Sequence, residues 1–275
     1  MLTFASSHVA MSATRERLIQ ACGEAADAAN IVGTGIRLPS YWPGDDVGKD
    51  VLFPDKETAG RQFYRLGYTL VSFTTLGSAF TSYLASTVET TPNVPTDATY
   101  SLLMACAVAA NTASLTSLVN ASPLSLVPGF VATPNGPISR DDSLKFAVRG
   151  LTRVTRHPLI LPVIPWGVAN AILAGNRPSD WLLFGGLAVY AIAGCAAQDL
   201  RVIRKEGSVG TVFVPDEGLL QEFFEATSFV PFGAVMDGRQ NLGDVAREVP
   251  WPAVVIGGVV GYQIEEAMLH FLALA

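Results

Sequence analysis

Long runs without a charged side chain constrain this chain more than any other feature. Five largely apolar segments are predicted to cross a membrane, at about 62–85, 99–118, 158–174, 181–197 and 250–272. A bilayer core takes about 20 apolar residues per helix, and its interior has no water to satisfy backbone polar groups. We therefore expect an all-α fold, a polytopic transmembrane helix bundle with five complete spans.

The composition agrees with a lipid-facing protein. Only 15% of the residues are charged and 49% are hydrophobic, whereas an average soluble domain has about a quarter charged residues. The net charge of −6 leaves no basic surface for nucleic acid, so nucleic acid is excluded as a partner and membrane lipid is expected. The three cysteines are far apart and indicate neither a disulfide framework nor a zinc site.

Polar segments separate the predicted spans. Residues 1–18 indicate a partial N-terminal helix that ends in a charged cluster. The stretches 19–60 and 200–249 are predicted to be polar loops, the first with one short amphipathic helix at Arg17–Ala29. With no internal repeat, residues 1–275 are predicted to form a single domain.

Lysine and arginine gather in alternate loops. The stretches 11–65, 128–156 and 200–249 hold 17 of the 18 basic residues, and only Arg177 falls elsewhere. Short loops rich in lysine and arginine stay on the side where the chain is made. The distribution therefore favours alternating spans, with the basic loops facing the cytoplasm, stroma or matrix.

The start of the third span carries the most unusual residues. The stretch Arg149–Gly175 begins with several arginines, among them Arg153 and Arg156. It continues through His157 and Pro158 into an apolar run. Pro158 suits the first turn of a helix, where its missing N–H would have no partner. The arginines are expected to pair with carboxylates or with lipid phosphate.

Asp199 is the predicted protein partner of Arg153 and Arg156. The hairpin of the third and fourth spans returns Asp199 to the face on which the arginines lie. Pro162 and Pro165 lie inside the third span, so we expect its first turns to be kinked or irregular.

Histidine and glutamate side chains in apolar surroundings are the candidates for chemistry. His8 lies in an apolar stretch, where an imidazole needs a partner: either it bonds to a neighbouring helix, or it ligates haem iron while its other nitrogen donates a hydrogen bond. Because His157 lies beside arginines, we expect it to cap a helix or to contact phosphate rather than to bind metal. His270 is expected to be incidental. Glu265 and Glu266 lie either at the membrane interface or facing protein, and the interface is the favoured place.

Four stretches resemble the NnrU family, and more closely its plant and algal branch, 15-cis-ζ-carotene isomerase. They read SSHVAMSATRERLIQ, GRQFYRLGYTLVS, LTRVTRHPLILPVIPWGVANAILAGN and TSFVPFGAVMDGRQ. The last is the most specific match, because no generic membrane helix requires its final four residues, Asp237, Gly238, Arg239 and Gln240. Order and spacing agree over most of the chain, except in the loops at 30–58 and 205–220.

The resemblance implies an integral protein of the plastid thylakoid or envelope, with its basic loops in the stroma. It implies haem b held between helices and cis-to-trans isomerisation of a carotenoid precursor, so that carotenoid is a substrate or a bound pigment. His8 would be the metal ligand, and His157 and Asn170 would belong to the cofactor site. The matching structural residues are Arg153, Arg156, Pro158, Trp166 and Asp199.

One departure from the family pattern leaves the activity open. Where the isomerase has Trp-Cys-Leu-Ala-His, this chain has Trp166, Gly167, Val168, Ala169 and Asn170. Gly167 has no ligand atom, and an amide is a poorer haem ligand than imidazole. One hypothesis is therefore a carotenoid isomerase with altered haem ligation. The other is a non-catalytic member that serves as a structural or pigment-binding subunit of a photosynthetic membrane complex, and a third is an NnrU-like protein outside carotenoid metabolism.

Overall fold

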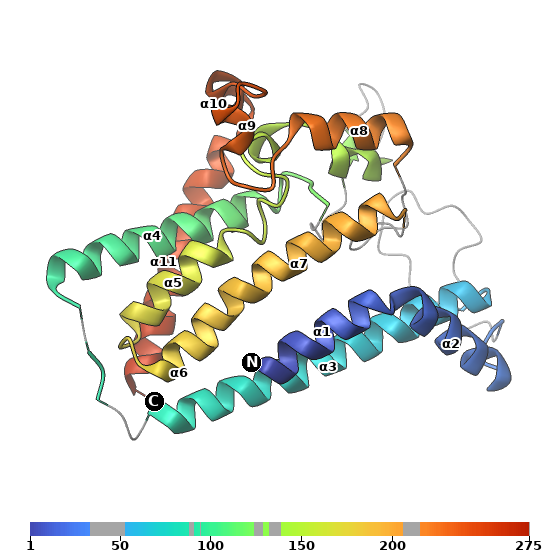
Figure 1. The fold of residues 1–275 in the computed structure, drawn as a ribbon, viewed down its shortest axis with the longest axis horizontal. Coiled ribbons are helices and arrows are strands. Elements are labelled where there is room, and N and C mark those ends of the chain that lie inside the picture. The colour runs from blue at the N-terminus through green and yellow to red at the C-terminus, as the bar shows by residue number, and fades with distance from the viewer. Residues whose placement is uncertain are drawn as a thin grey trace. The chain divides into compact units, whose positions relative to one another are not determined.

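A computed structural model gives the fold of most of the chain (Figure 1). Apart from one antiparallel pair of two-residue strands, β1 (Phe130–Val131) and β2 (Ser139–Arg140), the regular elements in the described residues are helical. The all-α prediction is thus confirmed. The described residues are 1–33, 53–87, 91–93, 95–123, 129–131, 139–205 and 215–274.

The chain divides into two compact units. The first comprises Met1–Ala79 with Phe130–Arg140, and the second comprises Phe80–Gly129 with Asp141–Ala275. Helix α3 (Lys56–Thr87) runs from one unit into the other. Because a continuous helix joins them, the division does not decide whether they are separate domains, and the single domain over the whole chain stays a prediction.

The first unit is built from α1 (Leu2–Ala13), α2 (Arg15–Ala28) and most of α3. The predicted amphipathic helix is α2, and the start of α3 also lies within the stretch predicted to be a polar loop at 19–60. Helices α2 and α3 approach closely at Gly60, where a Cβ atom would lie 2.2 Å from the Ile19 carbonyl oxygen. Only glycine permits this approach. Residues 34–52 lie outside the described residues.

The second unit is built around three long helices, α4 (Asp97–Thr116), α7 (Gly186–Ile203) and α11 (Trp251–Leu274), and the shorter α5 (Val163–Leu173). Helix α4 packs against both α11 and α5, and α5 packs against α7 (Figure 1). Helix α7 continues a π-helical turn, η3 (Trp181–Gly185), and the short α6 (Pro178–Asp180). The elements at one end of this bundle are η1 (Asp142–Phe146), η2 (Gly150–Arg153), α8 (Glu217–Ala226), α9 (Gly233–Met236) and α10 (Leu242–Glu248).

The stretch predicted to be a polar loop at 200–249 is largely helical where it is described. Asp216 caps α8 by accepting a hydrogen bond from the Leu219 N–H at 2.8 Å, and Asn241 caps α10 by accepting one from the Gly243 N–H at 2.7 Å. Such side chains supply the acceptors that the first turn of a helix lacks. The stretch is polar in composition because its helices are short and partly exposed. Residues 206–214 are outside the described ranges.

The count of five spans is not confirmed. Within the described ranges, two helices are long and apolar enough to cross a bilayer, Asp97–Thr116 and Pro178–Ile203. The third predicted span is reduced to the 11 residues of α5. The placement of the basic loops on one side of a membrane stays a prediction.

The prolines explain why α5 begins late. Pro162 is the N-cap of α5, and Pro165 lies in its first turn, where backbone N–H groups have no helical partner in any case. Pro158 therefore lies in a turn before the helix, not in its first turn as predicted. The His157 carbonyl oxygen accepts from the N–H groups of Ile160 and Leu161 at 3.2 and 3.0 Å, so the irregular start of this span is confirmed.

Candidate functional site

Asp199 joins the Arg-His-Pro motif to α7, as predicted. Its Oδ2 atom lies 3.3 Å from Arg156 Nη1, and its Oδ1 atom lies 2.8 Å from His157 Nε2. The Arg156 guanidinium also lies over the Phe224 ring, 4.3 Å from its centroid. Burial lowers the pKa of Arg156, and Asp199 opposes that shift. The carboxylate thus neutralises a cation that would be costly to bury alone.

His157 is fully buried between this carboxylate and the edge of the Phe229 ring, whose centroid is 5.6 Å away. Its Nδ1 atom has no hydrogen-bond partner among the described residues. The arrangement differs from the predicted helix cap or phosphate contact, because the partner is a carboxylate. The cofactor-binding role of His157 stays a prediction.

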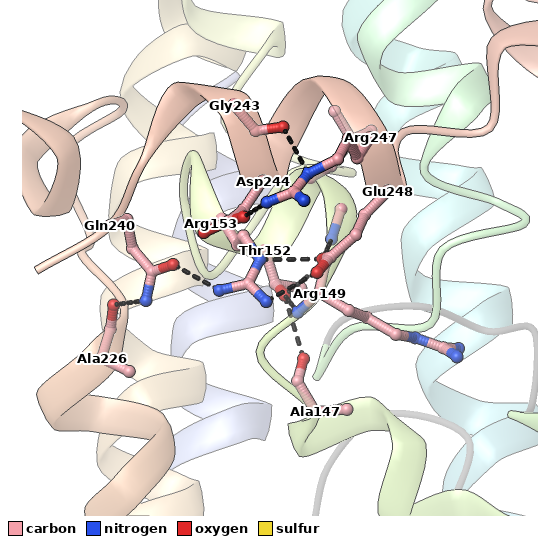
Figure 2. A network of polar contacts seen from close by, with 12 residues as sticks. Ala147, Arg149, Thr152, Arg153, Ala226, Gln240, Gly243, Asp244, Arg247 and Glu248 are labelled. Carbon is pink, nitrogen blue, oxygen red and sulfur yellow. Dashed lines mark hydrogen bonds and ion pairs between the residues drawn. The ribbon is translucent and has the colours of Figure 1, made fainter.

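Arg153 forms a second ion pair, with Glu248 at the end of α10 (Figure 2). Arg153 donates from Nε to Glu248 Oε2 at 2.8 Å and from Nη2 to Oε1 at 2.7 Å. Glu248 Oε2 also accepts from the Gly150 N–H at 2.8 Å. These donors, Arg153 first, lower the pKa of Glu248 to about 2, and the pairing raises the pKa of Arg153. A carboxylate partner for Arg153 is confirmed, but it is Glu248 and not Asp199.

The Asp-Gly-Arg-Gln segment ties α8 to this network. Gln240 accepts from Arg153 Nη1 at 2.6 Å and donates to the Ala226 carbonyl oxygen at 2.9 Å (Figure 2). Arg239 pairs with Asp237, with Nη2 2.7 Å from Oδ2, and donates to the Thr227 carbonyl oxygen at 2.8 Å. Gly238 has φ +78°, in the left-handed region that favours glycine. The segment that carries the most specific resemblance therefore organises the end of the bundle.

Backbone contacts bring the two motifs together directly. The Arg156 N–H donates to the Ser228 carbonyl oxygen at 2.9 Å, and the Phe232 N–H donates to the Val154 carbonyl oxygen at 2.8 Å. Phe232 has φ +62°, which is strained for a residue with a side chain. Arg153, Arg156 and Arg239 are each paired with a carboxylate at this end, so the arrangement fixes structure.

A second polar cluster lies in the bundle core and surrounds Glu265. Its Oε2 atom accepts from Trp166 Nε1 at 2.9 Å and from Asn111 Nδ2 at 3.0 Å, and Asn170 lies beside the same carboxyl group. Glu265 is fully buried, so its expected place at the membrane interface is wrong. Hydrogen-bond donors from α4 and α5 take the place of water around its carboxyl group. Hydropathy alone does not predict these contacts. Glu266 is exposed.

Gly167 marks a close approach of α5 to the helix that continues as α7. A Cβ atom there would lie 2.4 Å from the Phe184 carbonyl oxygen. A cysteine at this position would force the helices apart. The packing of α5 therefore leaves no room for a ligand side chain at position 167.

His8 lies in the first unit and is buried on α1. Its Nδ1 atom is 2.8 Å from the Phe4 carbonyl oxygen, and its Nε2 atom is 2.6 Å from Ser72 Oγ on α3. The Phe4 and Tyr68 rings pack on the imidazole with centroids 4.2 and 4.7 Å away. This is the expected bond to a neighbouring helix. His8 and Asn170 belong to different units, so their predicted juxtaposition stays a prediction.

Within the described parts of the chain, no group of three or more histidine, cysteine, aspartate or glutamate side chains could hold a metal ion. The model of the NnrU protein family matches residues 55–273. No curated protein and no solved structure matches the chain. The matched stretch includes the Arg-His-Pro motif, the Asp-Gly-Arg-Gln motif and the Glu265 cluster. The chain belongs to the NnrU family.

Proposed function

We propose that this NnrU-family protein is embedded in a membrane, with its basic loops on the stromal side of a plastid thylakoid or envelope. The two apolar helices leave large side chains exposed, with Leu102 70% and Val189 67% exposed. Apolar surface of this kind is disfavoured in water and is satisfied by lipid. The plastid location rests on the isomerase resemblance, and the orientation rests on the one-sided distribution of lysine and arginine.

The second part of the proposal is a haem b group held by His8. A carbonyl oxygen within 2.8 Å of Nδ1 suits an Nδ1–H donor, which makes Nε2 the basic nitrogen. Haem-ligating histidines have this arrangement, with the second nitrogen fixed by a backbone carbonyl. Ser72 Oγ, which donates to the Tyr68 carbonyl oxygen at 2.6 Å, lies where iron would approach, 2.6 Å from Nε2, so ligation would displace the Ser72 hydroxyl group. The Nδ1–Phe4 pairing is the observation that carries this proposal.

The third part is the activity, cis-to-trans isomerisation of a carotenoid precursor of the 15-cis-ζ-carotene type. Bound haem would supply an open iron position that can lower the bond order of a neighbouring polyene. In this chain His8 would hold the group, the Phe4 carbonyl oxygen would orient the imidazole, and the Phe4 and Tyr68 rings would exclude water.

Gly167 and Asn170 favour a second candidate function. The approach of Phe184 leaves no room for a ligand at position 167, and Asn170 donates to the Trp166 carbonyl oxygen at 3.0 Å within its own helix. A member without the second ligand would act as a structural or carotenoid-binding subunit of a photosynthetic membrane complex. This second function requires the helix bundle but not isomerase activity.

The discriminating experiment is an isomerisation assay with detergent-purified protein supplied with haem. The chain is incubated with tri-cis ζ-carotene under reducing conditions, and the isomers are separated by chromatography. We expect loss of the 15-cis isomer, abolished in His8→Ala and retained in His270→Ala, a matched control because His270 is exposed. No conversion by the haem-loaded chain refutes the isomerase proposal. Carotenoid that co-purifies with inactive protein supports the second candidate.

A further inference from the structure

The Glu265 cluster has a hydrogen-bonding pattern that the proposed function does not use. Two N–H donors, from Asn111 and Trp166, converge on Oε2 alone, at 3.0 and 2.9 Å. Among the residues that the structure describes, no lysine, arginine or histidine forms an ion pair with this fully buried carboxyl group. The groups that face it from α4 and α5 are two amides and an indole, none of which titrates. An ionised carboxylate in such a place would lack a countercharge.

Two acceptor oxygens in the same cluster lack a donor. Glu265 Oε1 and Asn170 Oδ1 are both buried, with no hydrogen-bond partner in the described part of the chain. The orientation of the Asn170 amide is set by its Nδ2 atom, which donates to the Trp166 carbonyl oxygen at 3.0 Å. Buried polar atoms almost always have a partner, so these two orphaned acceptors point to a donor that a shared proton would supply.

We propose that Glu265 is a proton-binding site, a neutral carboxylic acid that carries its proton on Oε1. In that form Oε2 is the carbonyl oxygen, and its two lone pairs accept from Asn111 and Trp166. The Oε1 hydroxyl donates to Asn170 Oδ1, so that a single proton satisfies both orphaned oxygens. No charge remains in the apolar core. The bundle thereby holds an acid, directed at Asn170, where α4, α5 and α11 meet.

The assignment does not depend on haem or on carotenoid, and infrared spectroscopy of the purified full-length chain tests it. A protonated carboxyl group has a carbonyl stretch well separated from that of a carboxylate. We expect this band at neutral pH, absent in Glu265→Gln and unchanged in Glu266→Gln, the matched control because Glu266 is exposed on the same helix. Absence of the band from the unmodified chain, or its persistence in folded Glu265→Gln, overturns the proposal.

A second pair of variants guards against a failure to fold. Asn170→Leu removes the acceptor of the Oε1 proton, so the Glu265 band should move to higher frequency without disappearing. In thermal unfolding, Glu265→Gln should stay close to the unmodified chain, because its amide also offers one carbonyl acceptor and one donor, whereas Glu265→Ala should unfold several degrees lower. An unmoved band in Asn170→Leu, or equal destabilisation by glutamine and alanine, contradicts a proton shared with Asn170.

Discussion

Replacing Glu248 by alanine tests whether the ion pair in Figure 2 holds the end of the bundle together. The substitution removes two hydrogen bonds from Arg153 and leaves the Gly150 N–H without its acceptor. Gln240 still accepts from Arg153 Nη1, so the guanidinium keeps one partner. The change therefore isolates the carboxylate.

The magnitude follows from burial. Hydrogen bonds between charged groups contribute about 1.5–3 kcal/mol each when they are sheltered. The side chains of Arg153 and Glu248 are 20% and 35% exposed, so water and salt reduce the pair to about 1–2 kcal/mol in total. Loss of the acceptor for Gly150 adds about 1 kcal/mol. We expect the free energy of unfolding to fall by about 2–3 kcal/mol, or a midpoint lower by about 4–12 °C.

Thermal unfolding of the detergent-solubilised chain, followed by circular dichroism, is the assay. Arg247→Ala is the matched control, since Arg247 is 78% exposed and pairs with Asp244 on the same helix α10. That variant should change stability by no more than about 0.5 kcal/mol. Equal effects of the two substitutions would refute the argument that the Glu248 pair differs from a surface ion pair.

The pH dependence of stability is a second, independent test of the Glu248 ion pair. Folding lowers the pKa of Glu248 from its ordinary value of 4.5 to about 2. A carboxylate with a depressed pKa stabilises the folded state above its unfolded-state pKa, and that stabilisation is lost as the pH falls through the folded value. The stability difference between the unmodified chain and Glu248→Ala should be constant above 4.5 and should shrink between 4.5 and about 2.

Three further substitutions probe other parts of the second unit, each by its unfolding midpoint. Gly167→Cys places an atom 2.4 Å from the Phe184 carbonyl oxygen and should prevent stable folding, whereas Gly194→Ala, with open space around it, should be neutral; a stable Gly167→Cys would disprove the close packing. Asp199→Asn removes the carboxylate that the Arg-His motif shares and should cost about 3 kcal/mol, so a loss below about 1 kcal/mol would argue against buried pairing. Phe232→Gly relieves φ +62° and should raise stability by about 1 kcal/mol; a marked loss would mean that the ring packs.

The partnership of Arg156 with Asp199 could be predicted because a helical hairpin returns its two ends to one face. The partnership of Arg153 with Glu248 could not, because it depends on how α8 to α10 fold over the end of the bundle. Glu248 lies just before the last long helix, on the same predicted side of the membrane as Arg153. That position is the sequence signal for their pairing.

Hydropathy misplaced two features for identifiable reasons. The span over 158–174 contains Pro162 and Pro165, and apolar composition cannot show that the α-helix begins only at Val163. Adjacent carboxylates late in an apolar helix favour the interface over a place facing protein, whereas Asn111 and Trp166 from other helices donate hydrogen bonds to the buried Glu265. The first error arises from prolines within the segment itself, and the second arises from contacts between segments distant in sequence.

The absorption spectrum of the purified chain, with haem supplied, tests the central claim most directly. We predict a Soret band that shifts on reduction with dithionite, disappears in His8→Ala and persists in His270→Ala. We also predict that Ser72→Ala retains the band, because this substitution removes only the hydroxyl group beside Nε2. A spectrum without a Soret band before and after reduction, or one that is the same in His8→Ala, would contradict haem binding by His8.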